Sequence, residues 1–397
     1  MRVTLIGAGV TGTQLIPEAV KILEKAQLII GSERLLAAVQ GFEGKKETAF
    51  RAEEIVRLIK NSRCDECAVL LGGDTGFYSG AAPLMERLER NQISAKVLPG
   101  ISSLQVLAAK KGTAWQDWTL LSAHGDSPDL LKAISLGKPV FLLTGSGDQA
   151  VRILDELTMR GLGDIKVTVA ENLGMSTERI SEGKAVVMAQ QTFSPLNVML
   201  IEPQEHHLPL CRPGGIDDSL FVRTDVPMTK REVRAVILSL LSPAPDEVCW
   251  DVGTGTGSVG VELALLSRET WAVDSNKAAC ALAEKNREHF RAWNMNIVCG
   301  EAPQVLEGLP DPDVLFVGGS GGALEEILSS ASKINPEVRI CVSAITLETL
   351  NKAVSWMRGH RMEPQVIQLQ AARSRKAGDS LMMTAINPVY LISGSKP

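Results

Sequence analysis

Short apolar runs alternate with longer amphipathic stretches along the whole chain. The runs have the length of strands, and most end in glycine or small polar residues before a stretch of helical length begins. In the first half they cover residues 2–6, 68–71, 97–98, 119–122, 140–143 and 167–170. In the second half they cover residues 248–252, 271–273, 296–298, 314–317, 339–342 and 382–387. This alternation predicts an α/β fold with largely parallel sheets.

Prolines and glycines interrupt the alternation between residues 203 and 227. A chain of 397 residues is also longer than one hydrophobic core usually serves. We therefore predict one domain over residues 1–202, a linker over 203–213 and a second domain over 214–397. The two halves show no sequence similarity, which indicates a fusion and not an internal repeat.

The composition narrows the class of protein. With 45% hydrophobic and 22% charged residues the chain is typical of globular proteins, and its net charge of −5 gives no support for nucleic-acid binding. No apolar run approaches the ~20 residues that span a bilayer. The N-terminus enters a strand directly, so we expect neither a leader peptide nor a membrane partner. Seven scattered cysteines suit a reducing, cytoplasmic environment.

Cys64 and Cys67 have the C-x-x-C spacing of zinc or redox sites. A structural zinc site needs a second pair of ligands, and none follows at a usable spacing. His206 and His207 stand in the interrupted stretch and are better explained as linker. We therefore expect a polar turn before the strand at 68–71 and no metal site.

The second half contains a strand that runs into a glycine loop and then a helix over residues 258–266. Gly253, Gly255 and Gly257 allow the backbone to approach a ligand where a Cβ would clash. Their spacing differs from the dinucleotide fingerprint, which has a wider gap before its last glycine. The next strand ends in Asp274, whose carboxylate can accept two ribose hydroxyls. A tight turn without a ligand is the alternative interpretation.

The first half contains the literal dinucleotide fingerprint over residues 7–12, with Glu33 about twenty residues further on. Pro17 argues against a nicotinamide site, because a fingerprint helix would place this proline in its interior at a cost of ~3 kcal/mol. The sequence instead predicts an extended loop through Ile16 and a helix that begins at Pro17.

Other strand ends in the first half also carry glycine and polar residues. The motifs are Gly72-Gly-Asp-Thr-Gly-Phe-Tyr78, Pro99-Gly-Ile-Ser-Ser103, His124-Gly-Asp126, Thr144-Gly145 and Glu171-Asn-Leu-Gly174. Open α/β sheets build a cleft at the edge where such strands end. Ser102 or Ser103 can also cap the following helix.

Taken in order, these motifs resemble the tetrapyrrole (corrin/porphyrin) methylase family, in its precorrin C5-methyltransferase branch, over about residues 1–202. Val10, Ile16 and Thr75 depart from the family pattern, which usually has proline, threonine and, in related branches, proline there. The resemblance implies a two-lobed domain that holds S-adenosylmethionine (SAM) between its lobes. The implied binding residues are Gly73, Asp74, Phe77, Ser102 and Ser103.

The second half resembles the precorrin-6B C15-methyltransferase (decarboxylating) family over about residues 214–394. The motifs that support this resemblance are Pro-Met-Thr-Lys at 227–230, the Asp251 glycine loop, Glu-Ala-Pro at 301–303, Val-Gly-Gly-Ser-Gly-Gly at 317–322 and Asn-Pro-Val-Tyr at 387–390. We expect Thr229 to cap a helix, with Glu232 in the capping-box position. The resemblance implies a Rossmann-like class I SAM methyltransferase domain whose cofactor residues are Thr229, Asp251, Gly253, Thr254, Gly255, Gly257, Asp274, Glu301 and Ala302.

Two unlike methylases in this order imply SAM-dependent methylation of a precorrin at C5 and C15, with loss of an acetate carboxyl, in cobalamin biosynthesis. The resemblance implies one SAM per domain, a tetrapyrrole substrate and a homo-oligomer formed through the C-terminal domain. A SAM enzyme for another substrate with a decayed first half, and a non-catalytic tetrapyrrole carrier, are the alternatives.

Methyl transfer to an enamine-like carbon needs alignment more than acid–base help, so no catalytic triad is expected and no catalytic residue is assigned. The polycarboxylate substrate should meet arginines. The candidates are Arg212, Arg223, Arg231, Arg234, Arg373 and Arg375.

Overall fold

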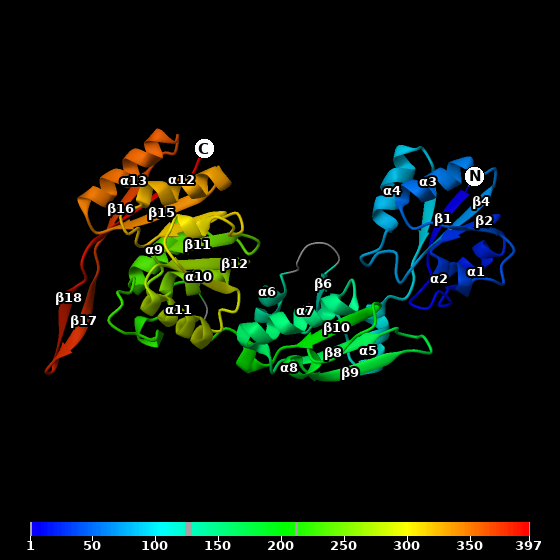
Figure 1. Ribbon diagram of the computed structural model, residues 1–397, viewed down its shortest axis with the longest axis horizontal. Coiled ribbons are helices and arrows are strands. Elements are labelled where there is room, and N and C mark those ends of the chain that lie inside the picture. The colour runs from blue at the N-terminus through cyan, green and yellow to red at the C-terminus, as the bar shows by residue number, and fades with distance from the viewer. Residues whose placement is uncertain (1, 124–128, 211–212, 397) are drawn as a thin grey trace. The chain divides into compact units, whose positions relative to one another are not determined.

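The computed structural model describes residues 2–123, 129–210 and 213–396. The chain divides into two compact units, which we call the first and second units (Figure 1). The first contains Met1–Leu130 and Lys138–Pro203, and the second contains Leu131–Gly137 and Gln204–Pro397. No helix among the described residues is both long and apolar enough to cross a membrane.

The first sheet of the first unit is entirely parallel, in the order β3-β2-β4-β1-β5. Its strands are β1 (Arg2–Gly7), β2 (Leu28–Gly31), β3 (Lys45–Thr48), β4 (Glu66–Leu71) and β5 (Ala95–Leu98). The helices that pack on it are α1 (Pro17–Leu23), α2 (Glu33–Ala38), α3 (Ala52–Asn61) and α4 (Ala81–Arg90), whereas α5 (Ser103–Lys111), which follows β5, packs on the second sheet of this unit. Alternation along β1 builds two cores, because Leu5 packs with α3 and α4 while Ile6 packs with α1 and α2.

The second sheet of the first unit is mixed, in the order β6-β7-β10-β8-β9. Its strands are β6 (Thr119–Ser122), β7 (Val140–Leu143), β8 (Lys166–Glu171), β9 (Arg179–Lys184) and β10 (Asn197–Glu202). The helices in this part of the chain are α6 (Leu130–Ser135), α7 (Gly147–Leu157) and α8 (Ala185–Met188). β6 and β7 are parallel, whereas β10 runs antiparallel to both β7 and β8.

The second unit has a seven-stranded sheet in the order β13-β12-β11-β14-β15-β19-β16, parallel except for β19. The strands are β11 (Val248–Val252), β12 (Glu269–Asp274), β13 (Met295–Cys299), β14 (Val314–Val317), β15 (Arg339–Ala344), β16 (Gln365–Leu369) and β19 (Val389–Gly394). The helices are α9 (Arg231–Leu241), α10 (Ser258–Leu266), α11 (Lys277–Phe290), α12 (Leu324–Ile334) and α13 (Leu347–Gly359). Val248, Trp250 and Val252 pack beneath α12 and α13, and Cys249 packs beneath α9 and α10. Helices therefore cover both faces of the sheet (Figure 1).

The expectation that residues 382–387 complete this sheet is wrong. Residues 382–385 lie in β18 (Ser380–Ala385), which pairs with β17 (Ala372–Ala377) in a separate two-stranded hairpin, and residues 386 and 387 follow it outside any strand. Every residue of β18 is exposed, so its apolar letters do not mark a core strand. The sheet is completed instead by β19, which begins after Asn387 and pairs with β15, and by β16 at the edge.

The first residues of α1, α5 and α9 can be compared with the helix starts and caps predicted from the sequence. α1 begins at Pro17 with Ile16 in extended conformation, as predicted. Ser102 caps α5 through a full capping box with Gln105, so Ser102 and not Ser103 is the cap. The predicted Thr229 cap is wrong: α9 begins one residue later, after Lys230, and has no side-chain cap.

Candidate functional site

The loops after β11, β12 and β14 meet at the carboxyl edge of the second unit's sheet. Gly253 and Gly319 are in backbone contact there, since a Cβ on Gly253 would lie 2.3 Å from the carbonyl oxygen of Gly319. The backbone N–H of Gly255 donates to Oδ2 of Asp274 at 2.9 Å. The structure thus brings the glycine loop, the acidic strand end and the loop at 318–322 together, as expected for a ligand-binding edge.

Asp274 is half-buried, and its second oxygen, Oδ1, accepts the N–H of Asn276 at 2.9 Å. Cys299 is its partner on β13, and the N–H of Gly300 donates to the Asp274 carbonyl at 2.9 Å. Glu301 follows directly and is exposed, while Ala302 is half-buried against the core. Both residues therefore follow the neighbouring strand at this same edge.

Asp251 lies beneath the glycine loop and has no exposed surface. Its Oδ2 accepts the hydroxyl of Thr254 at 2.5 Å. Burial raises the pKa of this carboxyl to about 7, with the Thr254 hydroxyl opposing the shift. Oδ1 of Asp251 and the hydroxyl of Thr256 have no hydrogen-bond partner among the described residues. Because its side chain is covered, Asp251 can act on a ligand only through the loop above it.

A buried ionic cluster holds the chain segment that precedes α9. Glu262 of α10 accepts three backbone N–H groups, from Gly214, Gly215 and Ile216, at 2.9, 2.7 and 3.2 Å. Its Oε1 also accepts from Nε of Arg234 at 2.7 Å, and both side chains are fully buried. Glu262 belongs to no motif, but an acidic residue inside the apolar run Ser258–Leu266 is a signal that the sequence carries.

The other end of this segment reaches the glycine loop. Asn286 of α11 accepts the N–H of Val222 at 2.8 Å and donates to the carbonyls of Val222 and Thr256 at 3.1 and 2.8 Å. A Cβ on Gly255 would lie 3.1 Å from the carbonyl oxygen of Pro227. The segment from 214 to 229 therefore passes directly over the loop and fixes its position.

The arginines predicted to bind the substrate differ in their burial and in their partners. Arg234 is wrong as a candidate, because it is fully buried and bonded to Glu262 and Asp218. Arg373 is held by Asp218 and by Glu232, which therefore does not serve a capping box. The remaining candidates Arg223, Arg231 and Arg375 are exposed, and Arg212 lies outside the described residues.

In the first unit, the loops after β1, β4 and β5 are in backbone contact. A Cβ on Gly7 would lie 2.5 Å from the nitrogen of Gly100, and one on Gly100 would lie 2.3 Å from the carbonyl oxygen of Gly73. Gly9 and Gly73 form a β-bridge. Asp74 ties this arrangement together, because its Oδ2 accepts the N–H of Gly100 at 2.9 Å.

A cavity of about 240 Å³ lies at this edge of the first unit. All five of its predicted binding residues line the cavity. They are Gly73, Asp74, Phe77, Ser102 and Ser103. The cavity is also lined by residues that the sequence did not identify as binding residues, among them Arg34, Tyr78, Thr144 and Asn197. His124, Gly125 and Asp126 lie outside the described residues.

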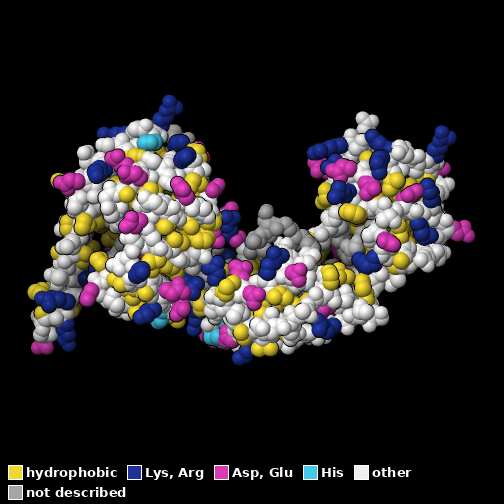
Figure 2. Space-filling model, in the orientation of Figure 1, with side chains coloured by type: hydrophobic (Ala, Val, Ile, Leu, Met, Phe, Trp, Pro, Cys, Tyr) yellow, Lys and Arg dark blue, Asp and Glu magenta, His cyan; other side chains and the backbone are white. Residues whose placement is uncertain are grey.

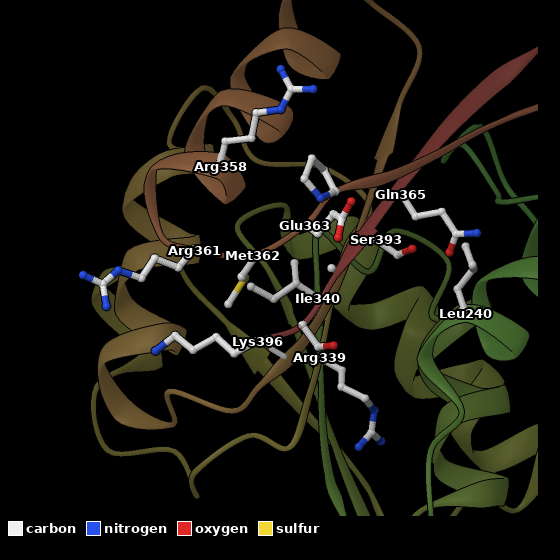
Figure 3. A pocket seen from close by; sticks show the side chains of 13 residues that line it. Leu240, Arg339, Ile340, Arg358, Arg361, Met362, Glu363, Gln365, Ser393 and Lys396 are labelled. Carbon is white, nitrogen blue, oxygen red and sulfur yellow. The ribbon is translucent and has the colours of Figure 1, made fainter.

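A larger cavity of about 760 Å³ opens at the opposite edge of the second unit's sheet (Figure 3). It adjoins Arg339 at the amino end of β15, whereas ligands of parallel sheets bind outside the carboxyl ends. Nη1 of Arg339 donates to Glu247 at 2.8 Å. Arg358 and Arg361 point away from the cavity in Figure 3. Because these cations do not converge, this cavity is not the candidate site.

Two family models match the chain in turn. One, described as tetrapyrrole (corrin/porphyrin) methylases, covers residues 2–186, and the other, described as a precorrin methyltransferase domain, covers residues 220–396. The loops at the two sheet edges and these matches define a methyltransferase with two different methylase units.

Individual relatives specify the family. The precorrin-6Y C(5,15)-methyltransferase (decarboxylating) of Sinorhizobium sp is 32% identical over 99% of this chain and 96% of its own. A Pyrobaculum calidifontis protein, named probable cobalt-precorrin-6B C(15)-methyltransferase (decarboxylating), is 42% identical over 45% of this chain and 94% of its own. The crystal structure of a Geobacter metallireducens precorrin-6Y C5,15-methyltransferase is 38% identical, covers 47% of this chain and 99% of its own, and has a TM-score of 0.45. The chain belongs to the precorrin-6Y C5,15-methyltransferase family, whose methyl donor is SAM.

Proposed function

We propose that this protein methylates a corrin precursor at C5 in its first unit and at C15 in its second, with loss of an acetate carboxyl as CO2, in cobalamin biosynthesis. One observation carries the proposal: each unit has its own glycine-lined site at the carboxyl edge of its own sheet. The relatives that match the whole chain and the second half alone bear names for these same reactions.

The second unit fits SAM. We infer that it is a Rossmann-like class I SAM methyltransferase domain, and its strand order, with one antiparallel strand next to the edge, supports this. The half-buried Asp274 offers a carboxylate for the ribose hydroxyls, beside the backbone of Gly255. Glu301 and Ala302 would contact the adenine, and Thr229 lies in the segment above the loop. Asp251 and Thr254 would act from below by fixing the loop.

The first unit fits SAM by a different arrangement. Its cavity joins the loops after β4 and β5 to residues of the second lobe, such as Thr144 and Asn197. The hydroxyl of Thr144 donates to the Asn197 carbonyl at 2.7 Å, which holds the floor of the cavity in place. Gly73, Asp74, Phe77, Ser102 and Ser103 would hold the cofactor here.

SAM supplies an electrophilic methyl group when it is bound. The protein must align the accepting ring carbon with it, and the rigid loop contacts at each site suit that role. Such alignment can contribute several kcal/mol once the reacting atoms are about 3–3.5 Å apart. No acid or base is required of the chain for methyl transfer to an enamine-like carbon.

The test is incubation of the full chain with precorrin-6B and SAM carrying a ¹³C-methyl group. Mass analysis should show two added methyl groups and one lost CO2, and NMR should place the label at C5 and C15. Calorimetry should count two SAM sites per chain. One site would support the alternative with a decayed first half, and no site would support the tetrapyrrole carrier; either count contradicts the proposal.

We also propose that the protein is a homo-oligomer assembled through the β17–β18 hairpin of the second unit. Arg373 ties β17 to the rest of the unit, whereas every residue of β18 is exposed. An isolated two-stranded hairpin is marginal in water, so a partner surface on β18 would stabilise it. Leu381 and Met383 share one face of β18 and are 75% and 63% exposed. Figure 2 shows hydrophobic and basic side chains along this hairpin. A second copy offers the same strand as a partner.

The location is proposed to be the cytoplasm. All six described cysteines are free thiols, and Cys249 and Cys341 are buried in the core of the second unit. Free buried thiols suit a reducing compartment.

A further inference from the structure

Arg34 lies at the rim of the first unit's cavity, on the first turn of α2. Its Nη1 donates to the carbonyl of Val10 at 2.7 Å. Its Nη2 lies 3.4 Å from the place that a Cβ would take on Gly72. The guanidinium therefore sits between the loop that follows β1 and the loop that follows β4. This hydrogen bond holds it beside the cavity.

This guanidinium has no counter-charge in the part of the chain that the structure describes. Asp74 is the carboxylate among the lining residues, and both of its oxygens are engaged, by the N–H groups of Gly76 and Gly100 at 2.9 Å each. The protein atoms around the guanidinium lower the pKa of Arg34, but an arginine side chain stays protonated in proteins and so carries its full charge here. Because a guanidinium has five N–H donors, most remain available to a ligand.

We propose that Arg34 binds a carboxylate of the tetrapyrrole substrate and is a specificity residue for methylation in the first unit. The inference rests on the proposed function. Arginine presents a planar fork that matches a carboxylate with two parallel hydrogen bonds.

The place of Arg34 in the cavity favours the tetrapyrrole over SAM as the source of the carboxylate. Ser102 and Thr144 are buried inside the cavity, whereas Arg34 is exposed at its rim. A macrocycle carries its carboxylates on peripheral side chains, and these pass the rim when a ring edge enters the site.

The experiment compares Arg34→Gln, Arg34→Lys and the control Arg57→Gln in the full chain. Arg57 is an exposed arginine on α3 and does not line the cavity. Methylation at C5 is followed by NMR from ¹³C-methyl SAM and precorrin-6B, so that both KM values report on the first unit. Arg34→Gln should raise the tetrapyrrole KM about tenfold to a hundredfold, the range for a lost charge-assisted hydrogen bond, and leave the SAM KM unchanged. Arg34→Lys should recover part of the loss, and Arg57→Gln should behave as wild type.

The outcomes separate the inference from the function on which it rests. A rise in the SAM KM alone overturns the inference, because the carboxylate would then be that of SAM. Unchanged KM values for both ligands overturn it as well. If Arg34→Gln lowers the thermal unfolding midpoint, the Arg34→Lys variant replaces it in the test. A raised tetrapyrrole KM with an unchanged SAM KM then supports the inference, and unchanged values for both ligands overturn it. A wild-type chain that leaves C5 unmethylated contradicts the proposed function itself.

Discussion

The carboxylate of Asp274 accepts the backbone N–H of Gly255 at 2.9 Å, which joins the end of β12 to the middle of the glycine loop. The two residues are nineteen positions apart in the chain, and they meet because β11 and β12 are parallel neighbours. A single carboxylate thus fixes the loop and faces the edge where the ribose of SAM is proposed to bind.

Asp274→Ala should weaken SAM binding in the second unit by ~1.5–3 kcal/mol, because charge-assisted hydrogen bonds to the ribose and to Gly255 are lost together. Titration calorimetry of the full chain measures this, with the first unit's site as an internal reference. Asp246→Ala is the control, since Asp246 is exposed in a loop away from the site. Equal SAM affinities for the two variants would show that Asp274 does not bind SAM.

Gly255→Val should abolish SAM binding in the second unit. Gly255 has a φ of +57° and the Pro227 carbonyl 3.1 Å from its missing Cβ, so a branched side chain strains the loop and fills its upper side. Gly308→Val is the matched control: its φ is +95°, and its Cβ would meet no atom within 4 Å. Both variants should lose stability in thermal unfolding, but only the first should stop methylation at C15. Methylation at C15 by Gly255→Val would show that this loop does not hold the cofactor.

Asp251 should make the second unit less stable as the pH rises toward neutrality. The folded state keeps its proton to about pH 7 because the pKa of this buried carboxyl is raised from 3.8. The unfolded state releases the proton near pH 4, so between these values the folded state binds more protons and stability falls with rising pH. Each unit of pKa difference corresponds to about 1.4 kcal/mol.

Asp251→Asn keeps the size of the side chain and an acceptor for Thr254 but cannot ionise. Its advantage in free energy of unfolding over wild type should therefore grow between about pH 4 and pH 7 and level off above that range. Urea titrations across this range measure the difference. Parallel curves for the two proteins would show that the carboxyl titrates normally.

Glu262→Gln should destabilise the second unit by about 3 kcal/mol, because it removes the negative charge nearest the fully buried Arg234 and weakens the hold on Gly214 and Gly215. Chemical denaturation measures the loss. The control Glu326→Gln, at an exposed position of α12, should change stability by no more than about 0.5 kcal/mol. Similar values for both variants would mean that Asp218 alone satisfies Arg234.

Aspartate at both Leu381 and Met383 should convert the oligomer into monomers, because it places charge on the face proposed to meet a second copy. Sedimentation velocity measures the assembly. Met159→Asp, which alters a 77% exposed methionine of the first unit, should leave the assembly unchanged. Wild-type protein that sediments as a monomer would contradict the proposal.

Residue patterns predicted the strands whose buried side chains alternate or run together, such as β1, β4 and β11. They missed β2 and β10, although Leu28–Ile30 and Val198–Ile201 are as apolar as the strands that were found. They also took exposed β18 for a core strand, because apolar letters do not show what packs on them.

The meeting of the loops at the carboxyl edge of each sheet was predictable, because glycine and acidic residues mark the strand ends in the sequence. The burial of Asp251 was not predictable. The sequence places this residue at the end of β11, but its burial beneath Thr254 depends on how the loop closes. Arg234 was taken for a ligand-facing cation for the same reason, since its partner Glu262 lies 28 residues away in the chain. Arg34 carried no motif signal, and only the fold places it beside Val10 and Gly72.

The backbone contact among Gly7, Gly73 and Gly100 leaves its three loops no room to rearrange around a guest. The conformational entropy of these loops is lost when the unit folds. A ligand that enters the neighbouring cavity therefore binds to loops that are already ordered, and little further entropy is lost on binding. The same crowding limits which substitutions these positions accept over evolution, because even one added methyl group at Gly7 or Gly100 would push the neighbouring loops apart.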